Sequence, residues 1–294
     1  MRRPAPSALA AIRHPGPKAS NRLPHVLCVA EADSFEPQAG EGLLEALGRW
    51  AERNGYSSAV LELQGLSLNS FDYVMPDRAI DDRHAAWYSD THTSKSAILE
   101  DAVAILGWKD GDWFAHIHAY WREGGAYRLG HLLPHTLIVR DATRLQGYGL
   151  KGARFEAQAD PETEFTLFRV AEDRTTPVQE EPNALITTLA PFEDLHESIA
   201  ALAGNLSPGP VAAHGLGSLA GAEFHEAAPM TGLISEILLK TPAGMTSDGV
   251  TMIPVRCVDL EGHLHEGRLV PGAAPTLVTC ELLLRRTGTE SLNV

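Results

Sequence analysis

Two adjacent glycines, Gly124 and Gly125, constrain the fold of this chain more tightly than any other feature. They stand between two apolar segments, and both central positions of a type I′ hairpin turn favour the positive φ that glycine adopts freely. The sequence therefore predicts an antiparallel hairpin in which Glu123 faces Ala126.

This register brings three histidines together. His118 lies directly opposite His131, and His116 lies on the diagonal of the same face, because side chains alternate along a strand with period two. Three imidazoles from two adjacent strands suit zinc or another first-row divalent metal, with a fourth position left open. The alternative is three histidines on a sheet surface that are satisfied by hydrogen bonds, and spacing alone leaves both interpretations open.

The charge distribution limits the partners of the chain. Residues 1–22 carry five basic side chains and no acidic one, so a formal net charge of −14 leaves −19 on the remainder. An acidic body repels phosphate, which argues against direct DNA binding by the body. The leader, residues 1–23, is rich in alanine and proline and is predicted to be disordered, with a basic arm for an acidic partner as the alternative.

Cysteine usage and hydropathy predict a cytoplasmic location. The three cysteines form no C-x-x-C pair, no secretory signal precedes them, and no apolar run is long enough to span a membrane. No nucleotide cofactor is expected, because the glycines Gly215 and Gly217 are not followed by a Gly-Lys-Ser/Thr sequence. We interpret these two glycines as a turn in which backbones approach closely.

One pattern occurs twice along the chain: strand, helix, strand, glycine turn and further strands. Helices are predicted over 41–54 and 192–203 from their apolar periodicity. The fold class is therefore α+β, with two tandem domains that each have a mainly antiparallel sheet and one or two packed helices. The predicted segments are a first domain over 24–170, a linker over 171–183, a second domain over 184–286 and a tail over 287–294.

The second copy lacks the metal ligands. The segment from Gly125 to Pro134 aligns without a gap with the segment from Gly262 to Pro271. This alignment places Ile253, Val255 and Arg268 at the positions of the three histidines, and none of these residues replaces a neutral imidazole. A metal is therefore expected in the first domain only, with packing or assembly as the role of the second.

A polar insertion of about 15 residues over 75–94 distinguishes the first copy from the second. Long polar loops often serve as lids or binding loops, and a solvated insertion without a function is the alternative. If the insertion folds over the histidines, its aromatic and polar side chains line a pocket or lid. These candidates are His84, Trp87, Tyr88, Asp90 and His92.

The hairpin also resembles a known family. Asp112-Trp-Phe-Ala-His116-Ile-His118, followed by Gly125-x4-Gly130-His131-Leu132, is similar to the PPC (plants and prokaryotes conserved) domain, which accompanies AT hooks in plants. The second copy resembles the same domain, in degenerate form, over 212–220 and 275–281. The resemblance implies an α+β fold that assembles as a trimer, and bacterial members carry a DNA-binding label. The chain departs from the family by having Leu129 before Gly130 and only Arg2-Arg3-Pro4 in place of an AT hook.

These observations predict a PPC-domain protein with a role in homo-oligomer assembly or in binding a small ligand. The alternative is a metal-dependent hydrolase or lyase that acts on a small polar molecule, with Glu123 or an aspartate of the insertion as its general base. A DNA-associated regulator is a third hypothesis, in which only the basic leader contacts DNA. Whether the chain is an enzyme stays open at this point.

Overall fold

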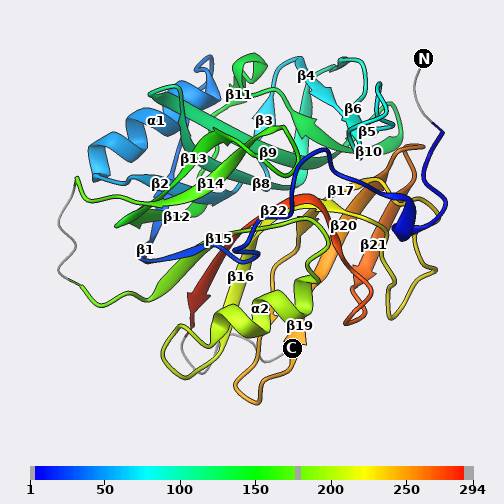
Figure 1. The fold of residues 1–294 in the computed structure, drawn as a ribbon. Helices are drawn as coiled ribbons and strands as arrows, with labels where there is room; N and C mark the ends of the chain where they lie inside the picture. Colours follow the sequence, from blue (N-terminus) through cyan, green and yellow to red (C-terminus); the bar gives the residue numbers. More distant parts are fainter. Residues whose placement is uncertain (1–3, 176–179, 288–294) are drawn as a thin grey trace.

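The computed structural model describes residues 4–175 and 180–287, which form two α+β halves (Figure 1). The segments 1–3, 176–179 and 288–294, parts of the predicted leader, linker and tail, lie outside the described residues. The main elements of the first half are β1 (His25–Phe35), α1 (Leu43–Asn54), β2 (Ser58–Glu62), β8 (Ala97–Lys109), β9 (Asp112–Glu123), β10 (Ala126–Leu132) and β12 (Leu145–Lys151). Those of the second half are β15 (Ala184–Leu189), α2 (Leu195–Ala203), β16 (Val211–Leu219), β17 (Ser235–Leu239), β20 (Pro254–Asp259), β21 (Leu264–Arg268) and β22 (Thr276–Arg286).

Shorter elements complete the two halves. A 3₁₀ helix over Leu9–Ala11 precedes β1, and another over Pro134–Thr136 follows β10. The first half adds β3 (Ser67–Leu68), β4 (Phe71–Val74), β5 (Pro76–Asp77), β6 (Trp87–Tyr88), β7 (His92–Ser94), β11 (Val139–Asp141), β13 (Ala153–Ala159) and β14 (Thr166–Glu172). The second half adds β18 (Ala243–Met245) and β19 (Thr251–Met252).

The two halves share one strand order, which confirms the predicted tandem α+β organisation. Hydrogen-bonded neighbours run β1–β12–β2–β8–β9–β10 in the first half and β15–β22–β16–β17–β20–β21 in the second. Every one of these neighbouring strand pairs is antiparallel. The edge strands β1 and β15 also pair with each other, with Val26 opposite Ile186, so the two sheets are joined along one edge.

The sheets pack face to face between the two helices (Figure 1). Helix α1 buries Leu43 and Leu47 on one face of the first sheet, and α2 covers the corresponding face of the second. The other faces meet in a shared apolar core in which Ile105 from β8 and Leu238 from β17 are both fully buried. The layers therefore run helix, sheet, sheet, helix, and side chains that point away from the helices face the other half.

Capping residues determine where α1 ends and where α2 begins. Gly55 has φ 68°, the left-handed conformation that commonly terminates a helix, at the end of α1. Helix α2 begins at Leu195, three residues later than predicted. Its N-cap Asp194 accepts hydrogen bonds from the backbone N–H groups of His196 and Glu197. Phe192, with φ 68°, cannot belong to the helix.

Burial of His196 makes stability depend on pH. Its Nε2 donates to the carbonyl of Leu269 at 3.0 Å, and burial lowers its pKa from the ordinary value of 6.5. The unfolded chain then binds more protons, so stability falls as the pH drops through the unfolded value. We expect His196→Gln, which keeps an N–H donor, to lose less unfolding free energy than the wild type between about pH 7.5 and 5.5. Urea unfolding of the metal-free proteins at both pH values measures this, and equal losses would refute it.

Glycine-rich strands account for two differences from prediction. Strand β12 was not predicted, because Gly147 and Gly149 interrupt the apolar and β-branched pattern that is typical of a strand. A Cβ on Gly149 would lie 2.2 Å from the ring of Tyr56, so the strand needs glycine there. The predicted turn at Gly215 and Gly217 is wrong, since both residues lie inside β16, although the expected close approach is present.

The gapless alignment of the two hairpins is also wrong by one residue. Strand β20 pairs with β21 so that Val255 faces Gly267, not Arg268. The reason is the turn: three residues with Gly262 at φ 81° separate Asp259 from His263, where the first hairpin has two. Ile253 and Val255 consequently point into the core under α2 rather than toward the other half.

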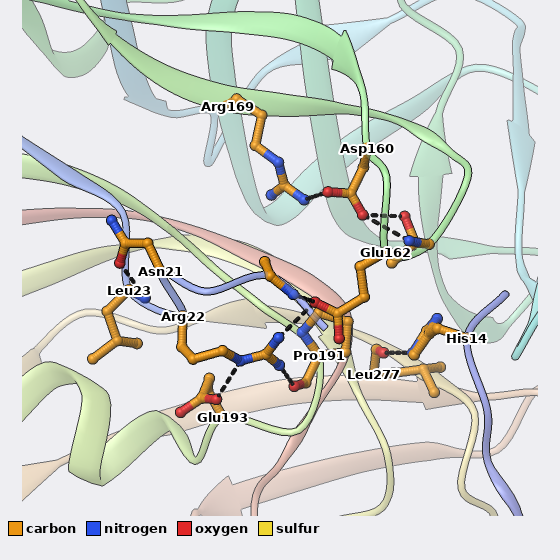
Figure 2. Close-up of polar contacts among 12 residues, drawn as sticks. His14, Asn21, Arg22, Leu23, Asp160, Glu162, Arg169, Pro191, Glu193 and Leu277 are labelled. Carbon is orange, nitrogen blue, oxygen red and sulfur yellow. Dashed lines mark hydrogen bonds and ion pairs between the residues drawn. The ribbon is translucent and has the colours of Figure 1, made fainter. Parts of the chain in front are cut away.

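The leader contacts the body, in contrast to the predicted disordered arm. Ile12 is 3% exposed and packs beside the insertion. The guanidinium of Arg22 lies 2.5 Å from Glu162 and 2.9 Å from Glu193 (Figure 2). Glu162 belongs to the β13–β14 loop of the first half and Glu193 precedes α2 in the second. The acidic partner of this basic residue is therefore the chain itself.

All three cysteines are free and buried, as reduced packing residues would be. No helix in the described part of the chain is long and apolar enough to cross a membrane.

Candidate metal centre between the two halves

The central hairpin has the predicted turn and register. Gly124 and Gly125 adopt φ values of 59° and 87°, as a type I′ turn requires. Glu123 pairs with Ala126, and His131 pairs with His118. The three histidines therefore meet on one face of the first sheet, the face that packs against the second half.

The three imidazoles converge on one point. One nitrogen from each of His116, His118 and His131 lies within 4.8 Å of the others, and no other group of this kind occurs among the described residues. In each ring Nδ1 has its own partner. The Nδ1 of His116 lies 2.7 Å from the Glu281 carboxylate, and that of His118 lies 2.7 Å from the carbonyl of Ile237. The Nδ1 of His131 lies 3.1 Å from the hydroxyl oxygen of Tyr88.

These partners leave the Nε2 atoms for a metal. A carbonyl and a carboxylate only accept, so the Nδ1 atoms of His116 and His118 carry the protons and their Nε2 atoms present lone pairs. The two Nε2 atoms lie 3.1 Å apart. This is close to the edge of about 3.3 Å that two imidazoles span around tetrahedral zinc with bonds of about 2.0–2.1 Å. Facing lone pairs repel unless a cation lies between them, so the donor set fits a divalent metal.

Burial favours the neutral form of two of the imidazoles, those of His118 and His131. It lowers the pKa of His118 and of His131 well below 6.5, and the nearby charge of His116 acts in the same direction. Neutral imidazole is the form that ligates metals. The rings of His118 and His131 can therefore bind a metal without first losing a proton.

The second half contributes two carboxylates that the sequence analysis missed. Glu281, on β22, is 1% exposed and bonds His116. Glu236, on β17, lies 3.7 Å from Nε2 of His118, and burial raises its pKa to about 8. The sequence did contain a signal for both carboxylates, because each is a single acid inside an apolar strand. The two segments are Ser-Glu236-Ile-Leu-Leu and Cys-Glu281-Leu-Leu-Leu. The general-base candidate Glu123 instead bonds Ser94 and the backbone of Lys95.

A cavity of about 280 Å³ opens beside His116 and His118. Its wall combines the insertion, the β13–β14 loop and the second half. Apolar side chains dominate this wall, including Ala86, Trp87, Phe165, Leu167, Ile234, Leu277 and Val278. The site therefore lies between the two halves and is not a feature of the first domain alone.

The structure separates the residues predicted for a pocket or lid. Trp87 and Tyr88, on β6, line the cavity, and Tyr88 also contacts His131. The ring of His84 packs 5.1 Å from that of Trp87 but does not line the cavity. His92 stacks on Tyr73 instead, and neither it nor Asp90 lines the cavity.

No family model matches the sequence, and no curated protein is significantly similar to it. Several solved structures are similar to about half of the chain. A metal-containing protein from Archaeoglobus fulgidus has 17% identity and a TM-score of 0.38, with 49% of this chain and 96% of that chain covered. A plant- and prokaryote-conserved (PPC) protein from Pyrococcus horikoshii has 18% identity and a TM-score of 0.36, with 49% and 94% covered. A candidate DNA-binding protein from Ralstonia eutropha has 19% identity and a TM-score of 0.34, with 47% and 88% covered.

The tandem organisation itself is established by the repeated strand order of the two halves. Each of these solved structures spans about half of this chain. Among the structures similar to half of this tandem α+β chain, one is described as a plant- and prokaryote-conserved (PPC) protein.

Proposed function

We propose that the protein binds a small ligand at a divalent metal held by His116, His118 and His131. The observation that carries this proposal is the convergence of one nitrogen from each of the three rings, while the Nδ1 atom of every ring lies beside a partner of its own. Three protein ligands leave a coordination position open for a ligand. The adjoining cavity gives that ligand room between the two halves.

The second half completes the site in this proposal. Its sheet supplies Glu281, Glu236 and the carbonyl of Ile237, so the copy without histidines orients the ligands of the other copy. Assembly into a trimer, a cytoplasmic location and DNA contact through the basic leader stay predictions. Arg22, one of the five leader cations, is already paired with Glu162 and Glu193.

A metal-dependent hydrolase or lyase is a second candidate, favoured by one observation. Glu236 lies 3.7 Å from Nε2 of His118 and lines the cavity, so its carboxyl is within reach of a molecule that binds beside the histidines and can exchange a proton with it. The hydroxyl of Tyr88 hydrogen-bonds to Glu236, which fixes the position of the carboxyl.

Metal analysis of the purified, tag-free chain tests the proposal. We expect about one equivalent of zinc or another first-row metal per chain, and none after His116, His118 and His131 are all changed to alanine. The matched control changes the exposed histidines His25, His135 and His263 to alanine and should retain the metal. A wild type that stays metal-free after addition of zinc, or a site variant that keeps the metal, would overturn the proposal.

A further inference from the structure

The charges around the cavity limit the kind of ligand. Of the residues that line it, Glu236 is the single acid, and neither lysine nor arginine is present. A phosphate ester or a nucleotide is commonly held by several cationic side chains, and no lysine or arginine lines this wall. An anionic ligand therefore has one place for its charge, the metal, and carries one charged head group.

The shape and chemistry of the wall favour a flat apolar body. The rings of Trp87 and Phe165 lie 5.5 Å apart at an angle of 56°, and both face the cavity. Aromatic rings in such an arrangement accept another ring edge-on or offset. The volume of about 280 Å³ is at the lower limit of ligand cavities, which span roughly 300–1,000 Å³, so the ligand is small.

Two buried polar atoms in the wall lack partners within the described chain. They are the hydroxyl of Thr279, a residue only 4% exposed, and Oε2 of Glu236, also 4% exposed. Both residues line the cavity. A buried polar atom without a hydrogen bond is costly, so these atoms indicate a ligand that brings its own polar substituent.

We infer that the ligand is a small aromatic carboxylate with a hydroxyl or amino substituent. This inference rests on the proposed function, because the carboxylate is anchored on the metal. The ring lies against Trp87 and Phe165, and the substituent reaches the hydroxyl of Thr279. Carboxylate oxygen is an ordinary zinc ligand, and the apolar wall excludes the water that would compete for the ring.

Calorimetric titration of the zinc-loaded full chain tests the inference, with acetate and benzoate as probes. We expect benzoate to bind about tenfold more tightly than acetate, because its ring buries apolar area against the wall. Trp87→Ala should remove most of this difference and leave acetate binding unchanged. Trp113→Ala, which removes a partly buried tryptophan on the far side of the first sheet, should preserve it.

The three hydroxybenzoate isomers test the polar substituent. We expect one isomer to bind about threefold or more tightly than benzoate, and Thr279→Val to abolish the gain without changing benzoate affinity. If zinc binds but acetate and benzoate bind equally, or if no isomer gains affinity, the inference is overturned while the metal site stands. If zinc itself does not bind, the proposed function has failed, and the zinc titration shows this before any probe is added.

Discussion

Replacing Glu281 with glutamine lowers zinc affinity by about 10- to 100-fold in our account, the usual effect of losing a carboxylate that orients a metal-bound histidine. Glu281 lies on β22 in the second half, 2.7 Å from Nδ1 of His116. Its negative charge fixes the tautomer of the ring and raises the basicity of Nε2. Glutamine keeps the shape and an accepting oxygen, so the fold is preserved. Competition titration with a chromophoric chelator measures the change.

The control for this experiment is Glu266→Gln. Glu266 lies on β21 of the same half and pairs with Lys240 at the surface, away from the histidines. Its replacement should leave zinc affinity unchanged. If Glu281→Gln binds zinc as tightly as the wild type, the second half does not support the metal site.

Ile105→Ala destabilises the protein by about 2–5 kcal/mol, the range observed when a buried isoleucine is truncated in a core that cannot collapse around the cavity. Ile105 is fully buried between the two sheets, with Leu238 of the second half in the same cluster. The measurement is the free energy of unfolding in urea, without metal. Because the two sheets share this core, we also expect one cooperative transition for both halves.

A matched variant is available on the same strand. Ile98, also on β8, is 54% exposed, and Ile98→Ala should change stability by no more than about 0.5 kcal/mol. Similar losses for the two variants, or separate transitions for the two halves, would contradict face-to-face packing of the sheets.

Local chemistry made the hairpin predictable. Two glycines select the turn, the turn sets the register, and strand periodicity then brings His116, His118 and His131 together. The repeated order of elements was visible for the same reason, because apolar periodicity and glycine turns act over short distances. The helices were found by periodicity, although Phe192 and its positive φ delay the start of α2.

The carboxylates of the second half could not be predicted, because they reach the histidines only through long-range packing. Nothing near His116 in the sequence indicates that Glu281, 165 residues away, bonds its ring. That contact exists only because the two sheets pack face to face, and sequence patterns do not determine which sheet faces meet. The predicted register of the second hairpin was wrong for a local reason. Its turn has three residues and ends at Gly262, and the sequence alone does not distinguish it from a two-residue turn.

X-ray absorption spectroscopy of the zinc-loaded chain tests the central claim most directly. Our account predicts three imidazole nitrogens at about 2.0–2.1 Å and one further light-atom ligand, with the imidazole signal lost when His116, His118 and His131 are replaced. Zinc with fewer than three imidazoles, or with a sulfur ligand from a cysteine, would contradict a metal centre built on this hairpin and completed by the second half.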